Sequence, residues 1–432
     1  MIEQAKKRAQ QRIVDAGLPK PGEESWRFSP LSSILDKQFA PALSAQLSGG
    51  MAASLYLAPI SCYRLVFHNG KFVEELSRLP QTGFKCGSLV DGVDETLLLG
   101  ADEKGFGALA ASKFQDGPYV VIPKGLKVDK PIHVVYVGTA TAGKPQEAHY
   151  RGVFVLGAGA SAVVVEESVG RAPGEFFTNS VSRFELGENA QLEHYTLLRE
   201  PDSFVGVRDF RAALSRSAGL KSHCVALGGA LQRCDSNVRL NGEGAEAELN
   251  GLYLAGGKQH FDFHTNVVHA KPHGTSRELY KGVLDGKARA VFNGMIEVEP
   301  NAQKTDANVY NKNLLLSEDG MVNTKPEFKI HANDVQCKHG ATIGQLREDA
   351  LFYLRSRGIG LVEARSLLVF AFASEMLGRM SLEPVREALS LKIQSVTGLG
   401  AKTVAAAAPE PKAAAPKSPA PKSAAPKAKG KR

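Results

Sequence analysis

The chain has 432 residues, of which 43% are hydrophobic and 23% charged, as expected for a globular protein with a large core. Its net charge of +8 lies almost entirely in residues 401–432, which carry seven lysines and one arginine against one glutamate. The remaining 400 residues are nearly neutral, so the folded part gives no argument for nucleic-acid binding.

The cysteines are scattered, odd in number and never spaced as CxxC, which excludes a disulfide framework and a zinc knuckle from one segment. They are Cys62, Cys86, Cys224, Cys234 and Cys337. The opening MIEQAKKRAQQ has no apolar signal region, and the most apolar stretch, Ser366 to Leu377, is too short to cross a bilayer. We expect a cytoplasmic protein that does not enter a membrane.

Residues 1–95 are expected to form a mostly helical N-terminal region, whose first helix ends at Gly17 before the helix-breaking LPKPG. From residue 96 to 341 the chain is rich in valine, glycine, threonine and asparagine and shows short alternating apolar runs, which predict β-strands. GAGASAVVVEE, GENAQLEHYTL and GEGAEAELNGLYL begin at Gly157, Gly187 and Gly242. This weak repeat favours a β-solenoid over an ordinary β-sandwich.

Helices are predicted again in residues 342–400, which suit the docking of a partner. Thr342 and Gln345 have the spacing of a capping box, Gly358 is expected to end the first helix and Ser381 to cap the third. Residues 401–432 repeat PKAAA-like units and are predicted to be a disordered basic tail. Weak tail contact with a polyanion is the one route to nucleic acid that stays open.

Several catalytic motifs are missing from the sequence. GVLDGKA, residues 282–288, is one residue short of a P-loop and lacks its hydroxyl, so no ATP hydrolysis is expected from this chain. GAGAS at 157–161 is interpreted as a solenoid turn because a strand follows it rather than a helix. We expect a protein that is not an enzyme.

One cluster of ligand-type residues lies between residues 260 and 273. In an extended strand His260, Asp262 and His264 would share one face and could form a facial metal site. His269 and His273 follow them. Histidines in polar β-turn regions also bond to backbone carbonyls, so a structural or interface role is the alternative.

A second candidate is DVQCKHGAT, in which Cys337 and His339 would point the same way from an extended strand. The pair could ligate one metal ion, act as a nucleophile and its base, or be inert. Zinc and iron–sulfur sites usually need four protein ligands, so a metal site here would take ligands from elsewhere.

A long block around this pair resembles the SufB/SufD family of the SUF iron–sulfur cluster assembly machinery. It consists of HTNVVHAKPHGTSRELYKGVL, KTDANVYNKNLLLSEDGMVNTKPEFKIHANDVQCKHGATIGQL and LFYLRSRGI, and GLPKPGEESWRFSPL resembles the family more loosely. The resemblance covers about residues 1–400. It implies a right-handed parallel β-helix between helical regions, with residues 342–400 docking the ABC-type ATPase SufC.

The resemblance also implies a branch and a site. SufB-like members carry a cysteine near Asn311 and acids on both sides of His339, whereas this chain has YNKNLLLS, Lys338 and Gly340. This departure favours the SufD branch. In that branch Cys337 and His339 would face a SufB partner and contribute to a transient iron–sulfur cluster, and ATP-driven SufC dimerisation would shift the interface and expose them.

Several alternatives stay open at this point. The chain could be a SufB-like paralogue or a standalone metal-binding β-helix protein that uses the His260–His273 cluster. A polysaccharide-acting enzyme is disfavoured because no acidic or aromatic groove pattern repeats along the strands. The sequence leaves undecided whether the chain pairs with SufB or with a second copy of itself.

Overall fold

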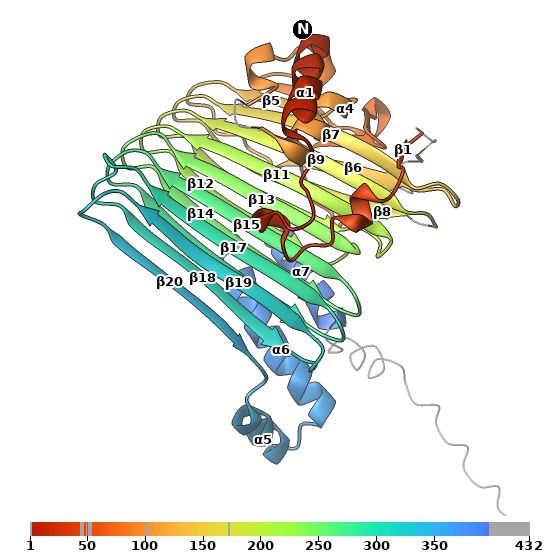
Figure 1. Ribbon diagram of the computed structural model, residues 1–432, viewed down its shortest axis with the longest axis vertical. Coiled ribbons are helices and arrows are strands. Elements are labelled where there is room, and N and C mark those ends of the chain that lie inside the picture. The colour runs from red at the N-terminus through yellow and green to blue at the C-terminus, as the bar shows by residue number, and fades with distance from the viewer. Residues whose placement is uncertain are drawn as a thin grey trace, which may run out of the picture.

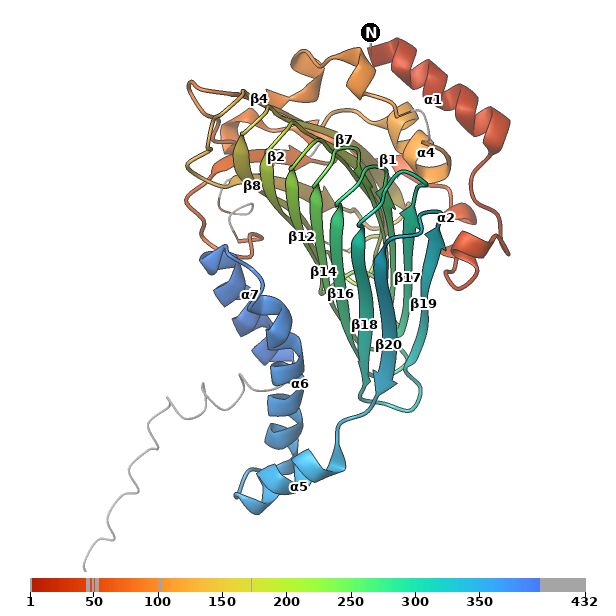
Figure 2. The same cartoon turned by 90° about the vertical axis from the view of Figure 1, so that its left-hand side faces the viewer.

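The computed structural model describes residues 2–43, 47, 48, 50, 54–100, 103–171 and 173–396. Two long sheets face each other, and helices lie at the N-terminal end and along one flank (Figures 1 and 2). The predicted tail at 401–432 lies outside the described residues.

The sheets are built by strands that alternate between them along the chain. From β5 onward each strand pairs in parallel with the strand two further on, and each pair of consecutive strands makes one coil. Leu231, His260 and Arg289 stack in register in this way, 29 residues apart. The fold is therefore mainly β with a β-solenoid core, as the sequence predicts.

We name the sheets after the strands that dominate them. The odd sheet contains β4 (Lys85–Ser88), β5 (Pro118–Ile122), β7 (Gln146–Leu156), β9 (Phe176–Leu186), β11 (Phe204–Leu214), β13 (Leu231–Leu240), β15 (His260–His269), β17 (Arg289–Val298) and β19 (Met321–Ile330), with β1 (Ala40–Pro41) beside β7. The even sheet contains β2 (Tyr63–His68), β3 (Lys71–Phe72), β6 (Ile132–Thr139), β8 (Ser161–Arg171), β10 (Gln191–Arg199), β12 (Gly219–Ala226), β14 (Glu246–Ala255), β16 (Thr275–Leu284), β18 (Asp306–Leu315) and β20 (Gln336–Gly344).

The glycine repeat marks equivalent turns of successive coils. A Cβ atom on Gly157, Gly187 or Gly242 would lie within 2.7 Å of backbone in the coil beneath, so only glycine fits. The intervening turn around Ser217 has no glycine, which explains why the sequence repeat skips one step. GAGAS is confirmed as a turn, because β8 follows it directly.

Alternate residues of each strand point between the sheets and form the main core. This core is largely aromatic and aliphatic, and stacked pairs such as Phe154 and Phe184, with ring centroids 4.3 Å apart, join adjacent coils. The outward-facing apolar residues of the even sheet form a second cluster with the C-terminal helices.

The N-terminal region contains more strand than the sequence suggests. Its helical elements are α1 (Ile2–Ala16), η1 (Glu24–Trp26), α2 (Ser32–Leu35), η2 (Glu74–Leu76), η3 (Leu89–Asp91), η4 (Glu95–Leu97) and, beyond residue 95, α4 (Gly105–Lys113). Gly17 follows α1 with φ +75°, as predicted. However, β1 to β4 also precede residue 96. Of these, β2 begins at Tyr63 and is a short run whose parallel partner, β6, is supplied only by the tertiary fold.

Three helices follow the solenoid: α5 (Glu348–Ser356), α6 (Leu361–Leu377) and α7 (Glu383–Val396). Gly358 ends the first with φ +85°, as expected. The capping box at Thr342 is wrong, because β20 continues through Gly344 and Thr342 pairs with Lys312. Ser381 does not cap α7 with its hydroxyl, which bonds to Glu193 of β10 instead. In both cases contacts with the sheet prevail over a local helix signal.

Within the described residues, no helix combines the length and the apolar character needed to cross a bilayer.

Candidate functional site

Cys337 and His339 lie on β20, the last strand of the even sheet. β20 pairs with β18 on one side, with Cys337 beside Ala307 and His339 beside Val309. Among the strands that the structure describes, none pairs with its other side. The final strand of the odd sheet, β19, has the same unpaired position, so both sheets end on full-length edges (Figure 2).

The two side chains point the same way, as the sequence predicts for an extended strand. Cys337 packs against the main core and is partly buried, whereas His339 is exposed. The His339 ring stacks on Phe328 of β19, with centroids 4.7 Å apart and planes 16° from parallel. The pair therefore faces the space between the two sheets at the open end of the solenoid, where one further coil would cover it.

The environment of Cys337 keeps its thiol protonated. Burial raises the pKa of this thiol above its ordinary value, the nearby Asp306 carboxylate raises it further, and the Ala307 backbone N–H acts in the opposite direction. Metal binding requires the thiolate, so a metal ion would have to displace the proton, and its affinity should fall as pH falls.

The chain brings only part of a ligand set to this end. Among the described residues, no three His, Cys, Asp or Glu side chains are grouped as a metal site. Asn311, where a sister branch would carry a cysteine, is buried and bonds to Tyr253 Oη and the Tyr280 carbonyl. Cys337 and His339 thus offer two ligands at the surface of the described structure.

The three residues predicted to share a face of β15 do so, but they are engaged with protein groups. Asp262 lies 2.6 Å from Arg233 Nη1 and 2.9 Å from His264 Nε2. His260 Nε2 lies 3.0 Å from the Ser29 hydroxyl. Burial would raise the pKa of Asp262, but the charges of Arg233 and His264 hold it well below its usual range. The arrangement is an ion-pair network that fastens the N-terminal segment to the sheet.

The other two histidines of this cluster lie elsewhere. His269 is on the interior side of β15, 2.9 Å from the Ser276 hydroxyl, and burial lowers its pKa to about 4. His273 occupies a turn with φ +59°, and its backbone N–H donates to Gln303 O of the next coil. The structure therefore does not bring the five residues from His260 to His273 into one site.

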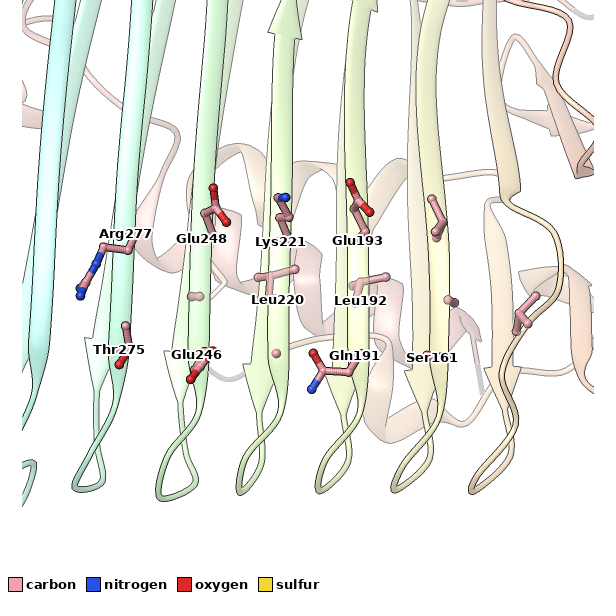
Figure 3. Close-up of a pocket in the computed structure, with 15 residues that line it drawn as sticks. Ser161, Gln191, Leu192, Glu193, Leu220, Lys221, Glu246, Glu248, Thr275 and Arg277 are labelled. Atoms are coloured by element: carbon pink, nitrogen blue, oxygen red, sulfur yellow. The ribbon is translucent and has the colours of Figure 1, made fainter. Parts of the chain in front are cut away.

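A groove of about 470 Å³ runs across the outer face of the even sheet (Figure 3). Glu193, Lys221, Glu248 and Arg277 lie side by side there, one on each of four neighbouring strands. The charges alternate in sign. Glu193 accepts from Ser381 and Glu248 lies 2.9 Å from Arg379, so both carboxylates hold the C-terminal helical region against the sheet.

Two contributors to the site at β20 were not singled out in the sequence. Phe328 stacks on His339, and Asp306 acts on the Cys337 thiol. The alternation in MVNTKPEFKI places Phe328 on the inner side of a strand, but its partner depends on which strand lies opposite. That pairing is a property of the fold.

The chain matches proteins of one family along most of its length. The family model for the SUF system FeS cluster assembly SufBD core domain matches residues 138–372. The chain is 31% identical over 391 residues to the iron–sulfur cluster assembly protein SufD of Escherichia coli (strain K12), covering 89% of this chain and 90% of that protein.

Two further relatives agree with this match. An iron–sulfur cluster assembly SufBD family protein of Synechocystis is 34% identical over 385 residues and covers 84% of each chain. SufD of Bacillus subtilis is 26% identical over 293 residues, covering 67% of this chain and 66% of that protein. The core-domain model matches more than half of the chain and Escherichia coli SufD matches about nine-tenths of it, so this β-solenoid protein belongs to the SufB/SufD family of SUF iron–sulfur cluster assembly proteins, closest in type to SufD.

Proposed function

We propose that this chain is a SufD-like, non-catalytic scaffold subunit that works in the cytoplasm within a SufBCD-type complex. Cys337 and His339 would hold iron and sulfide together with ligands from a SufB-type partner, until the cluster is transferred. The observation that carries this proposal is the position of the pair on the inner side of an unpaired edge strand, at the open end of the solenoid.

The edge itself favours a protein partner. Unpaired strands of this length are sites where another strand adds through backbone hydrogen bonds. Ile343, Met321 and Ile330 expose 40–47% of their surface at the same end. A partner that extends the two sheets would cover these side chains and bring its own ligands within reach of Cys337 and His339.

The ATPase partner would dock on the C-terminal helical region. Around the joint between α5 and α6, Phe352, Tyr353 and Val362 are 57–76% exposed, although they are large and apolar. Figure 2 shows α5 standing away from the solenoid. An apolar surface of this kind suits a protein interface, and ATP hydrolysis would then come from the SufC-type partner.

The test is to co-express this chain with its SUF partners and to replace Cys337 by Ser and His339 by Asn separately. Iron and acid-labile sulfide in the purified complex should fall at least several-fold in each variant, because each removes one of two ligands from this side of the interface. Cys86→Ser, a cysteine in β4 at the opposite end, is the matched control and should leave the content unchanged.

Unchanged iron and sulfide in both variants would reject the site. The scaffold proposal has its own readout, because the chain should co-purify with an ABC-type ATPase and Val362→Asp should reduce that recovery. Full recovery of the ATPase with Val362→Asp would reject α5 and α6 as its docking surface.

A further inference from the structure

A second cysteine, far from β20, lies in an environment that the scaffold role does not use. Cys62 directly precedes β2 on the outer face of the even sheet, near the N-terminal end of the solenoid. We propose that Cys62 is a peroxide-reactive thiol, activated by Arg64 and His133 and oriented through Glu167, and that it forms a sulfenic acid with small hydroperoxides.

Arg64 supplies a fixed positive charge beside the sulfur. Its Nη2 atom lies 3.5 Å from Cys62 Sγ, and its guanidinium lies 4.3 Å from the centroid of the Tyr56 ring. Residues 62 and 64 point to the same face of the strand because they are two apart. The guanidinium is thus held by the tyrosine on one side and directed at the sulfur on the other.

His133 approaches from the next strand of the sheet, where it is the register partner of Arg64. The ring is completely buried, and its Nε2 lies 2.9 Å from Glu167 Oε2. Nδ1 has no conventional hydrogen-bond partner among the described residues. Cys62 and Glu167 are the two neighbours that raise the pKa of His133, and because Glu167 lies at Nε2 we assign the thiol to the Nδ1 side.

Glu167 is held in place by several donors. Its Oε1 atom accepts the Leu57 backbone N–H at 2.9 Å and also pairs with Arg199. Burial would raise the pKa of Glu167, but His133 and Arg199 lower it below its ordinary value, so the group stays ionised. An ionised carboxylate fixed behind an imidazole holds the ring in position and favours its protonated form, as in nucleophilic triads.

The electrostatics agree with a thiolate–imidazolium pair. Burial would raise the pKa of Cys62, but His133 and Arg64 together bring it below its ordinary value. Burial would lower the pKa of His133, but Cys62 and Glu167 raise it. The groups that lower the pKa of the thiol are Arg64 and His133, while Glu167, Arg199 and Tyr56 lie around them.

The chemistry is balanced with a hydroperoxide as the named oxidant. The Cys62 thiolate attacks one oxygen of H₂O₂, the S–O bond forms, and the O–O bond breaks. The departing hydroxide takes the proton of the His133 imidazolium and leaves as water, while Arg64 stabilises the developing negative charge. Sulfur is oxidised to the sulfenic acid, and peroxide is reduced.

The surroundings of Cys62 restrict the reagent. Cys62 is 8% exposed, which admits a molecule of the size of H₂O₂ more readily than a bulky disulfide. Cys62 belongs to the apolar cluster that holds α6 and α7 on the sheet, so oxidation would add a polar oxygen atom to this cluster.

The experiment compares two cysteines within the unmodified full-length chain. Limiting H₂O₂ is added at pH 7, the reaction is quenched, and the chain is unfolded with dimedone present and mapped by mass spectrometry. Cys62 should be labelled at least about tenfold faster than Cys86, whose pKa burial raises to about 12 although it is the more exposed of the two. Labelling of Cys86 at the same rate or faster would overturn the proposal.

Two further readouts test the named partners. The rate at Cys62 should rise with pH and level off at a lower pH than the rate at Cys86, because the Cys62 thiolate forms first. Glu167→Gln should move that midpoint upward and slow labelling about tenfold. If Glu167→Gln folds and keeps the labelling rate and the pH midpoint of the unmodified chain, the triad is rejected. If that variant does not fold, the unmodified chain decides: a pH midpoint for Cys62 that is no lower than that of Cys86 rejects the proposal.

Discussion

The two ends of the solenoid are finished in different ways. At the N-terminal end the sheets stop on short antiparallel strands, β4 beside β5 and β3 beside β2, and a helical cap in which α1 packs on α4 lies against β7 and β9 (Figure 2). A fully buried ion pair between Arg151 and Glu103 lies in this cap. At the C-terminal end β19 and β20 are long, and among the described strands each is paired on one side only.

This difference is the reason for placing the proposed partner surface at the C-terminal end. Short or capped edges prevent strand addition, whereas long open edges with exposed apolar side chains invite it. The same end presents Cys337 and His339.

The interiors of the two ends also differ. Near the N-terminal end the space between the sheets is filled by aromatic rings such as Phe154 and Phe184. Toward the C-terminal end it contains Glu278, Asn311 and Asn313, all buried. Neither carboxyl oxygen of Glu278 has a geometric hydrogen-bond partner among the described residues, and burial raises its pKa to about 8.

The largest expected effect concerns this polar interior. Below pH 4.5 Glu278 is protonated in both states, but between pH 4.5 and 8 it ionises only in the unfolded chain, so the native protein loses stability as pH rises. Glu278→Gln removes this loss. Its stability gain over the unmodified chain should grow across that range and approach roughly 5 kcal/mol at pH 9, as an upper bound.

Chemical denaturation at several pH values measures this gain. The exposed Glu318→Gln provides the control, with no pH-dependent difference expected. A gain that is constant from pH 4 to 9 would show that Glu278 is not protonated inside the solenoid. The polar interior at the C-terminal end would then not make stability depend on pH.

A second prediction uses one glycine from each end. A Cβ atom on Gly117 would lie 1.9 Å from the Arg151 carbonyl oxygen, whereas one on Gly344 would meet nothing within 4 Å. Gly117→Ala should therefore cost about 3 kcal/mol of unfolding free energy, and Gly344→Ala should cost almost nothing. Thermal or denaturant unfolding compares them. Equal destabilisation would contradict the picture of a tightly capped end and an open one.

The smallest expected effect concerns the open edge itself. The Gln336 N–H donates to Thr305 O, so the N–H groups of odd-numbered residues of β20 point away from β18. Ala341→Pro removes one of these outward donors and should weaken binding of a SufB-type partner about fivefold, or ~1 kcal/mol, without unfolding the chain.

Thr342→Pro is the matched comparison, since it removes an inward N–H and should lower the unfolding midpoint instead. Partner affinity measured by titration, with the midpoint measured alongside, separates the two variants. If Ala341→Pro binds the partner as well as the unmodified chain, the edge of β20 is not the surface that pairs.

The comparison also shows why the sequence predicted some features and missed others. The glycines at 157, 187 and 242 predicted stacked coils, because the backbone of the preceding coil lies too close to each of them for a Cβ atom to fit. The capping signals at Thr342 and Ser381 failed because propensity is weak against a strand partner or a carboxylate such as Glu193. The five residues from His260 to His273 looked like one cluster because sequence proximity hides the alternation of a strand and the turn after it.

By itself the sequence determined the β-solenoid, the three helices after it and the shared face of Cys337 and His339. These features follow from local spacing, from period two in the strands and from glycines where coils touch. Only the tertiary structure decided that β20 is an edge, that Phe328 stacks on His339, and that Cys62, Arg64, His133 and Glu167 meet. Those contacts join residues many positions apart, and their register depends on the packing of the whole stack.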